Sequence, residues 1–249
     1  MNMLEVKGLC KKFGDLEIIC GIDLAVKKGQ RHAIIGPNGA GKTTFFNLLS
    51  GHYKPSAGDI YFKGQKISGL QPYRINRLGL GRSFQITNVF PGLTVLENVR
   101  SVVLSRHGVR FNFWRTVAGM EEVNRESMGI LEEIGLEAKA DHLAGEMAYG
   151  EQRALEIGLV LASQPEMILL DEPTAGMSID ETREAVKLVD RVTEGKTLMI
   201  IEHDMEVVFS LADVITVISY GEVLASGTPE EIRNHPKVQE AYLGTGIAC

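Results

Sequence analysis

A glycine-rich stretch that ends in a lysine and two threonines has the residue types and spacing of a phosphate-binding loop. Its members are Gly36, Pro37, Asn38, Gly39, Ala40, Gly41, Lys42, Thr43 and Thr44. The glycines allow successive backbone N–H groups to turn toward a phosphate, and the helix expected to follow adds the partial positive charge of its N-terminus. Such a loop places its lysine on the β- and γ-phosphates of a nucleotide and its threonine hydroxyl on Mg²⁺. We therefore predict these roles for Lys42 and Thr43.

Two neighbouring acids, Asp171 and Glu172, follow the apolar segment 167–170. The carboxyl ends of parallel strands form the edge at which ligands bind in α/β proteins. We predict that Asp171 ligates Mg²⁺ directly or through a water molecule, and that Glu172 polarises a water for in-line attack on the γ-phosphate. A pair of acids alone can equally cap a strand, but the phosphate-binding loop upstream favours the catalytic interpretation.

Three further positions complete the set of candidate residues. Gln85 follows a short strand-like segment at 82–84, and His203 lies just past the apolar segment 197–201. The segment 147–153 reads Met-Ala-Tyr-Gly-Glu-Gln-Arg and opens a helical pattern. Because a helix N-terminus presents N–H groups and partial positive charge, this segment can bind an anion.

Strand and helix patterns alternate along most of the chain and must position these side chains. Strands are expected at 4–9, 18–26, 31–35, 59–62, 167–170, 197–201, 214–219 and 223–226. Helices are expected at 43–50, 93–103, 128–136, 151–162, 179–192 and 205–212, with two short helices near the C-terminus. Apolar strands separated by helices predict a parallel sheet covered on both faces. Since 87–163 contains only helical patterns, we expect an α/β core over 1–86 and 164–249, interrupted by a helical subdomain.

Composition limits the classes of protein to which the chain can belong. Of its 249 residues 44% are hydrophobic, enough for a sizeable core, and the formal net charge of −6 disfavours nucleic acid as a partner. No uncharged apolar stretch of about 18 residues occurs, and the charges of Glu5 and Lys7 argue against a signal peptide. Cys10, Cys20 and Cys249 are too scattered for a disulfide framework or a zinc site. We expect a reducing, cytosolic setting and no special role for these cysteines.

The order of the motifs resembles that of the ATP-binding subunits of ABC transporters, over roughly residues 3–243. The resemblance implies a single ABC ATP-binding domain over 1–249, with a P-loop NTPase (RecA-like) α/β core, an antiparallel β subdomain and the inserted α-helical subdomain. The segment 175–178 then corresponds to the family's D-loop, which meets a partner protomer.

The same resemblance implies roles for three side chains. Phe13 corresponds to the aromatic residue that stacks on adenine, with packing at a strand edge as the alternative. Gln85 corresponds to the residue that senses Mg²⁺ and the attacking water and links to the membrane partner. His203 corresponds to the switch histidine that contacts the γ-phosphate.

The segment that corresponds to the family's signature predicts a dimer. If the helical block projects from the core, this loop cannot reach the phosphate-binding loop of its own chain. A second subunit packed head-to-tail would instead bring Ala148, Tyr149, Gly150 and Glu151 over the γ-phosphate of the first. The family's usual L-S-G-G-Q reads Met-Ala-Tyr-Gly-Glu here, so Ala148 has no hydroxyl to offer that phosphate. A lost charge-assisted hydrogen bond costs about 1.5–3 kcal/mol, which predicts that the site completed by this signature is the weaker one.

Three stretches resemble the ATP-binding subunits of branched-chain (hydrophobic) amino-acid importers: 81–99, 170–177 and 227–244. The resemblance implies an Mg²⁺-dependent ATPase on the cytoplasmic face of the cell membrane. Its partners would be a similar but non-identical ATP-binding subunit, hence a heterodimer, then membrane permeases and, indirectly, an external binding protein. Urea importers and the lipopolysaccharide-export ATPase share much of the pattern and remain alternatives.

Two rival classes fit the sequence less well. A soluble ABC ATPase that acts on nucleic acid or ribosomes usually has two cassettes in one chain or zinc or coiled-coil insertions, none of which occurs here. A P-loop kinase would need an acceptor pocket, and it would need neither a signature loop nor His203.

The aromatic and basic segment 111–115 has two interpretations, packing between helices or contact with a permease loop or lipid headgroups. We expect no appended regulatory domain.

Overall fold

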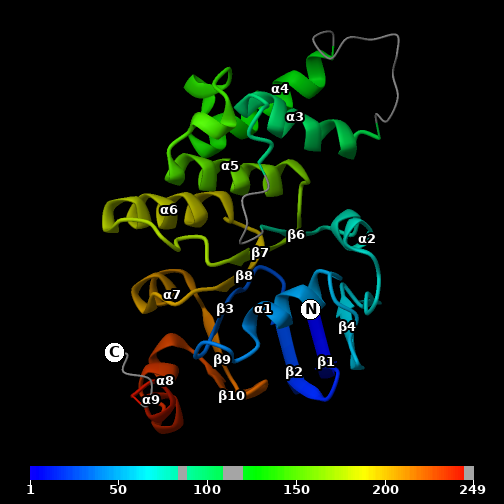
Figure 1. The fold of residues 1–249 in the computed structure, drawn as a ribbon, viewed down its shortest axis with the longest axis vertical. Coiled ribbons are helices and arrows are strands. Elements are labelled where there is room, and N and C mark those ends of the chain that lie inside the picture. Colours follow the sequence, from blue (N-terminus) through cyan, green and yellow to red (C-terminus); the bar gives the residue numbers. More distant parts are fainter. Residues whose placement is uncertain (84–88, 109–119, 244–249) are drawn as a thin grey trace. The chain divides into compact units, whose positions relative to one another are not determined.

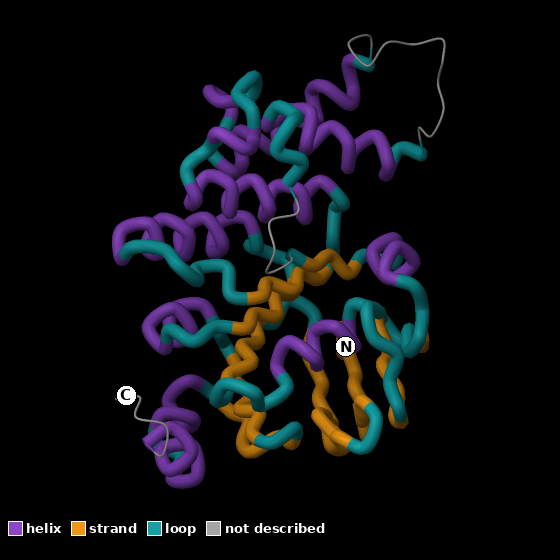
Figure 2. Tube along the Cα trace, in the orientation of Figure 1, coloured by secondary structure: helices purple, strands orange, loops and turns teal. Residues whose placement is uncertain are grey.

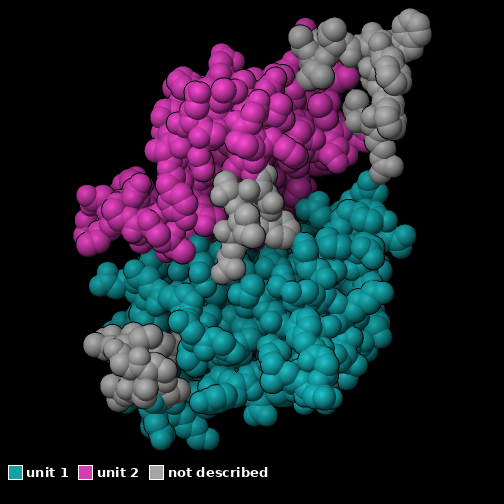
Figure 3. All heavy atoms as spheres, in the orientation of Figure 1, with its two compact units in different colours: residues 1–82, 166–172, 195–249 teal, residues 83–165, 173–194 magenta. Residues whose placement is uncertain are grey.

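The architecture comes from a computed structural model that describes residues 1–83, 89–108 and 120–243. The chain divides into two compact units, which Figure 3 colours separately. Unit 1 comprises 1–82, 166–172 and 195–249, and unit 2 comprises 83–165 and 173–194. Segment 173–194, expected in the α/β core, groups with unit 2 because its helix packs on other helices of that unit.

A six-stranded sheet lies in unit 1, in the order β10-β9-β3-β8-β7-β6. Its strands are β3 (Arg31–Ile35), β6 (Leu80–Arg82), β7 (Met167–Asp171), β8 (Thr197–Ile201), β9 (Val214–Ser219) and β10 (Glu222–Gly227). Successive neighbours from β9 to β6 pair in parallel, which confirms the predicted parallel sheet, while β10 pairs antiparallel with β9 at the edge. Every residue of β7 and β8 is buried, as expected for strands covered on both faces.

A second, antiparallel sheet also belongs to unit 1, in the order β2-β1-β4-β5 (Figures 1 and 2). Its strands are β1 (Asn2–Phe13), β2 (Leu16–Lys27), β4 (Ala57–Phe62) and β5 (Gln65–Lys66). The long strands β1 and β2 carry buried apolar side chains between exposed ones, with irregularities where their register shifts. Leu9 and Ile19 on its buried face pack in one apolar cluster with Phe45 and Phe46 of α1 (Lys42–Leu49). The first helix and both sheets therefore share a core.

The remaining helices of unit 1 are short. They are α2 (Pro72–Arg77), α7 (Met205–Leu211), α8 (Pro229–Arg233) and α9 (Pro236–Leu243). Asp204 caps α7 by accepting a hydrogen bond from Glu206 N at 2.8 Å, and Thr228 caps α8 by accepting from Glu231 N at 3.3 Å. The two last helices confirm the short C-terminal helices predicted from the sequence.

Unit 2 is helical in its described residues. It contains α3 (Val95–Arg106), α4 (Glu121–Ile134), α5 (Tyr149–Ala162), α6 (Ile179–Val192) and the 3-10 turns η2 (Glu137–Lys139) and η3 (Ala144–Glu146). Ser178 begins α6 with a capping box, in which Ser178 N donates to Glu181 Oε2 at 2.9 Å. Leu131 and Leu155, from α4 and α5, are fully buried in this unit. Within the described part of the chain, no helix has both the length and the apolar character needed to cross a membrane.

Candidate functional site

A pocket of about 310 Å³ in unit 1 gathers most of the predicted chemistry. It is lined by Ile18, Asn38, Gly39, Ala40, Gly41, Lys42, Thr43, Thr44, Glu172 and His203. The glycine-rich loop joins β3 to α1, and the first residues of α1 line the pocket. The N-terminus of α1 therefore borders a cavity in which its partial positive charge can act on an anion.

Two positions show why the loop needs glycine. Gly36 has φ +153° and Gly41 has φ +101°. A Cβ added to Gly36 would lie 2.0 Å from Ile218 O, and one added to Gly41 would lie 2.8 Å from Ile19 Cδ1. Both distances are too short for non-bonded atoms, so strands β2 and β9 approach the loop backbone as closely as glycine permits.

Lys42 is held inside the loop by backbone carbonyls. Its Nζ donates to Gly36 O at 2.7 Å and to Pro37 O at 3.0 Å. Burial lowers the pKa of Lys42, and the carboxylates of Glu172 and Asp171 partly oppose that shift. The ammonium group is thus fixed at the pocket by neutral acceptors, which leaves its charge available to an anionic ligand.

Glu172 and His203 face one another at the pocket. Glu172 follows β7 with φ +50°, a left-handed conformation that costs a non-glycine residue on the order of 1–3 kcal/mol. Its N–H donates to Ile201 O at the end of β8, at 2.9 Å. Its Oε1 lies 2.9 Å from His203 Nε2. The sheet thus holds Glu172 in an unfavourable backbone conformation, with its carboxylate directed at the imidazole of His203. Strained residues of this kind are common at functional sites.

Asp171 is buried beside Glu172 and does not line the pocket. Its Oδ2 forms an ion pair with Arg82 Nη2 at 2.9 Å, and the two side chains are 0% and 6% exposed. Burial raises the pKa of Asp171, whereas the Arg82 charge and hydrogen bond act to lower it. Arg82 Nη1 also donates to Asn47 Oδ1 at 2.8 Å and to Ser50 Oγ at 2.7 Å, which ties the pair to α1 and its C-terminal end.

The residues proposed for Mg²⁺ have chemistry that fits the ion. Asp171 Oδ1 is buried and has no hydrogen-bond partner among the described residues. Thr43 supplies a hydroxyl at the pocket. Both are hard oxygen donors of the type that Mg²⁺ prefers, and the unused Asp171 oxygen can accept from a water on the ion.

Sequence reasoning missed Arg82 as a site residue. The sequence could have indicated such a residue, because a buried carboxylate at the end of a strand requires a positively charged partner. The arginine that satisfies this need lies on β6, three residues before Gln85. Gln85 itself and the segment 111–115 lie outside the described residues.

Phe13 lies at the end of β1 and does not line the pocket. Its side chain is 44% exposed, so it is not part of the core. Its ring centre lies 5.2 Å from that of Tyr53, with the planes at 80°, and Lys11 Nζ is 4.8 Å from the Phe13 ring centre. Stacking of Phe13 on adenine stays a prediction, and Tyr53 is a second exposed ring that sequence reasoning did not identify.

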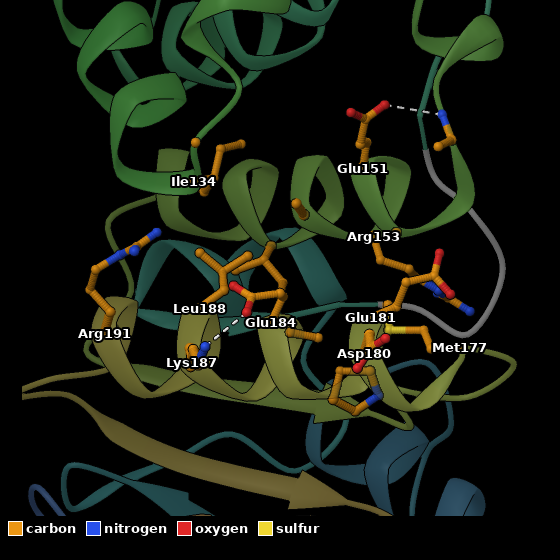
Figure 4. Close-up of a pocket in the computed structure, with 17 residues that line it drawn as sticks. Ile134, Glu151, Arg153, Met177, Asp180, Glu181, Glu184, Lys187, Leu188 and Arg191 are labelled. Atoms are coloured by element: carbon orange, nitrogen blue, oxygen red, sulfur yellow. Dashed lines mark hydrogen bonds and ion pairs between the residues drawn. The ribbon is translucent and has the colours of Figure 1, made fainter.

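The signature segment forms the N-terminus of α5 in unit 2. Ala148 is the N-cap residue, and its N–H donates to Glu151 Oε2 at 3.1 Å. Figure 4 labels Glu151 on this helix. Glu151 also forms an ion pair with Lys139. Tyr149 OH donates to Ala175 O at 2.9 Å, which joins the signature segment to the segment 175–178. Both segments predicted to meet a partner subunit are therefore linked within one unit.

A second pocket of about 590 Å³ lies beside α5 and α6 in the same unit (Figure 4). Its apolar lining includes Ile134, Ile157 and Leu188, and charged side chains such as Lys187 and Arg191 also line it. Arg191 Nη2 donates to Glu133 O at 2.9 Å and fixes α6 to α4.

Two family models match the chain. One described as "ABC transporter" matches residues 19–175, and one described as "Branched-chain amino acid ATP-binding cassette transporter" matches residues 222–248. Among curated proteins, the high-affinity branched-chain amino acid transport ATP-binding protein BraF of Pseudomonas aeruginosa is 41% identical, over 97% of this chain and 98% of its own length. The corresponding protein LivG of Escherichia coli is 40% identical, with the same coverage of both chains.

Solved structures of related cassettes have the same fold. A nucleotide-free ATP-binding cassette of an ABC transporter superposes with a TM-score of 0.85 at 31% identity, covering 97% of this chain and 99% of the other. A dimeric cassette in a post-hydrolysis state, bound to ADP and Pi, superposes with a TM-score of 0.77 at 27% identity. That match covers 91% of this chain and 99% of the other.

Proposed function

Because this chain belongs to the ABC transporter family of ATP-binding proteins, we propose that the unit 1 pocket is where it binds and hydrolyses ATP. The chain has the α/β fold of ABC ATPase cassettes and is the ATPase subunit of an importer for branched-chain amino acids. The observation that carries the assignment of the site is the pocket itself, which brings the glycine-rich loop, Glu172 and His203 together.

Binding rests on the loop and on α1. Backbone N–H groups of the loop and the N-terminus of α1 stabilise the phosphates, and Lys42 places its charge on the β- and γ-phosphates. Thr43, Gln85 and, through its free oxygen, Asp171 would hold Mg²⁺, which when bound neutralises charge on the phosphates. Phe13, and by the same chemistry the neighbouring Tyr53, would provide a stacking surface for adenine.

Hydrolysis rests on Glu172 and His203. Glu172 accepts a proton from the attacking water, and His203 contacts the γ-phosphate. The 2.9 Å contact between Glu172 Oε1 and His203 Nε2 orients the carboxylate before a nucleotide arrives. The pocket thus acts by positioning groups and by matching charge, which are the main contributions of protein to phosphoryl transfer.

We place the second half of each ATP site on another subunit. Ala148, Tyr149, Gly150 and Glu151 at the N-terminus of α5 would close over the γ-phosphate bound by a partner. A related cassette has been solved as a dimer in two structures, one of them bound to ADP and Pi. The pair would be a heterodimer with a similar ATP-binding subunit, docked on membrane permeases at the cytoplasmic face and served by an external binding protein.

Uptake into vesicles tests this function. Proteoliposomes that contain the permeases and both ATP-binding subunits, with ATP inside on the side of this chain and the external binding protein outside, should accumulate radiolabelled leucine. With Glu172→Gln, uptake and phosphate release should fall together, by about 10²–10⁴-fold for the loss of a general base. Glu194→Gln, a matched change of an exposed acid, should leave both at the normal rate. Unimpaired uptake with Glu172→Gln would remove Glu172 from the proposed role.

A further inference from the structure

Two cysteines lie opposite one another on the hairpin beside the nucleotide pocket. Cys10 of β1 and Cys20 of β2 are direct partners in the antiparallel register, and both are free and partly exposed. Their chain neighbours Leu9 and Ile19 are fully buried in the core. Because side chains alternate between the faces of a strand, the two thiols share the other side of the hairpin, where both are partly exposed.

The backbone geometry of this pair permits a direct bond between the sulfurs. Cys10 O accepts from Ser56 N at 2.9 Å, and Cys20 N donates to Gly221 O at 2.9 Å, so these backbone groups point away from the opposite cysteine. This is the non-hydrogen-bonded type of antiparallel pair, in which Cα atoms lie about 4.5 Å apart. Disulfides form across Cα separations of about 4.4–6.8 Å. The two cysteines therefore need little backbone movement to join.

Cys20 is also connected to the phosphate-binding loop. Gly221 accepts from Cys20 N, and its own N–H donates to Ala40 O at 3.1 Å. Ile18, two residues before Cys20 and on the same face of β2, lines the pocket. A Cβ on Gly221 would lie 2.3 Å from Ile18 O and 3.0 Å from Cys20 Sγ, so β2 and Gly221 pack as closely as glycine permits. A displacement at Cys20 therefore reaches the loop through one bridging glycine.

We propose that Cys10 and Cys20 are a reversible oxidation site, and that closing the intrachain disulfide weakens nucleotide binding in the adjacent pocket. In the thiol form, Cys10 Sγ lies 3.6 Å from Gly8 O and Cys20 Sγ 3.7 Å from Tyr220 O. A bond of about 2.05 Å between the sulfurs draws both away from these carbonyls. Loss of the Cys20 Sγ contact with Tyr220 O releases the turn that positions Gly221, whose N–H donates to Ala40 O, so the reduced form is the one that binds ATP well.

The oxidant is a low-molecular-weight disulfide such as oxidised glutathione. The Cys10 thiolate attacks one of its sulfurs, which forms a mixed disulfide and releases one glutathione thiolate. Cys20, whose pKa is raised by partial burial, then attacks Cys10 Sγ as its thiolate and releases the second glutathione. Two protein thiols lose two protons and two electrons, and one glutathione disulfide becomes two thiols. An excess of reduced glutathione reverses both steps, so the site is a thiol pair at rest in a reducing compartment.

Mapping of the linkage tests the site itself. Treatment of the full-length protein with oxidised glutathione should lower the count of free thiols from three to one per chain. Trypsin cleaves after Lys7, Lys11, Lys12 and Lys27, so the expected product without reductant joins the peptides 8–11 and 13–27. Cys249→Ser should still give this product, whereas Cys10→Ser and Cys20→Ser should not. A bond to Cys249, bonds only between chains, or unlinked oxidised cysteines would overturn the proposal.

Nucleotide affinity tests the coupling, which rests on the ATP site proposed above. The oxidised wild type should bind ATP at least about fivefold more weakly than the reduced protein, the lower end of typical coupling between sites. Reductant should restore binding, and oxidant should change nothing in Cys10→Ser. A linked protein with unchanged affinity would refute the coupling. If the reduced wild type and Lys42→Ala bind ATP equally, ATP does not bind in this pocket. The mapping of the Cys10–Cys20 disulfide does not depend on that outcome.

Discussion

At the scale of single residues, the arginine at the end of β6 pairs with the buried aspartate beside the pocket. Arg82 is buried against Asp171 and also bonds Asn47 and Ser50 at the other end of α1 from the loop. A buried carboxylate without a counter-charge tends to take up a proton, and a protonated Asp171 is a poor acceptor for water on Mg²⁺. Arg82 is therefore a positioning residue whose charge opposes the effect of burial on the pKa of Asp171 and favours the ionised carboxylate.

Removal of this arginine should cost both stability and metal affinity. Breaking one partner of a buried ion pair costs about 3–5 kcal/mol, so Arg82→Met should lower the free energy of unfolding in urea by that amount. It should also raise the Mg²⁺ concentration needed for half-maximal ATPase activity, which a purely structural role would leave unchanged.

A double-mutant cycle provides the control. Arg82→Met combined with Asp171→Asn leaves no uncompensated charge and should lose less stability than the sum of the single changes. Simple additivity would contradict a direct coupling between the two side chains.

The sequence predicted many of the residues that line the pocket. It missed residues whose roles depend on a contact with another segment of the chain. Lys42, Glu172 and His203 were found because their local motifs encode the loop and strand end on which they lie. Arg82 escaped notice because its partner is distant in sequence. The opposition of Cys10 and Cys20 depends on the register of a hairpin with irregularities on either side of that pair, which no local pattern encodes.

At the scale of elements, the start of α5 differs from an optimal helix N-terminus. Glu151 accepts from the N–H of Ala148, but Ala148 has no side-chain oxygen to accept from the first turn in return. Half of a capping box is therefore present. The absent hydroxyl is the same one that we expect to matter at the γ-phosphate of a partner.

Ala148→Ser should complete the box. We expect the free energy of unfolding to rise by about 1 kcal/mol and ATPase activity and ATP affinity of the assembled dimer to increase. Ala154→Ser, in the interior of the same helix, should instead cost about 0.5 kcal/mol and leave turnover unchanged. Denaturation with urea measures the change in stability, and phosphate release measures the change in turnover. No gain in either rate or affinity would contradict the role assigned to the missing hydroxyl.

Strand β3 buries a histidine whose titration affects stability. His32 is 1% exposed, its Nε2 lies 2.8 Å from Thr216 Oγ1, and burial lowers its pKa to about 4. The unfolded chain, with an ordinary histidine pKa of about 6.5, then binds more protons than the folded chain between these two values. The stability that neutral His32 contributes is therefore complete above about pH 6.5 and is lost as the pH falls toward 4.

Denaturation at two pH values measures this contribution. Between about pH 7 and pH 5 the wild type should lose about 2 kcal/mol more stability than His32→Gln, which cannot titrate. His142→Gln, a change of an exposed histidine, should behave as the wild type does. An equal loss in wild type and His32→Gln would show that His32 is not held neutral.

Most long elements could be predicted from periodicity. The bounds of β3, β8, β9 and α6 agree with the expected segments because each is a continuous apolar or amphipathic run. The strand expected at 82–84 lies two residues earlier, as β6 at 80–82. Because β6 is only three residues long, its position follows from pairing with β7 and not from a local pattern. Helix α2 and strand β5 were not predicted, because six and two residues carry too little pattern.

At the scale of the whole molecule, the proposed mechanism requires two chains for one ATP. The loop, Glu172 and His203 belong to unit 1, whereas the signature segment and the segment 175–178 belong to unit 2 and are bonded to each other. In the proposed dimer, each subunit would bind one triphosphate through unit 1 and cover the triphosphate of its partner through unit 2. Binding of ATP would join the subunits, and hydrolysis would release them.

Sedimentation of a hydrolysis-deficient variant tests whether ATP joins two subunits. Glu172→Gln, mixed with its partner ATP-binding subunit, should sediment as a monomer without nucleotide and as a dimer with ATP and Mg²⁺. The dimer should persist because the bound ATP is not cleaved, and adding Lys42→Ala should abolish it. A variant that stays monomeric at saturating ATP, and still releases phosphate at the wild-type rate, would contradict the account.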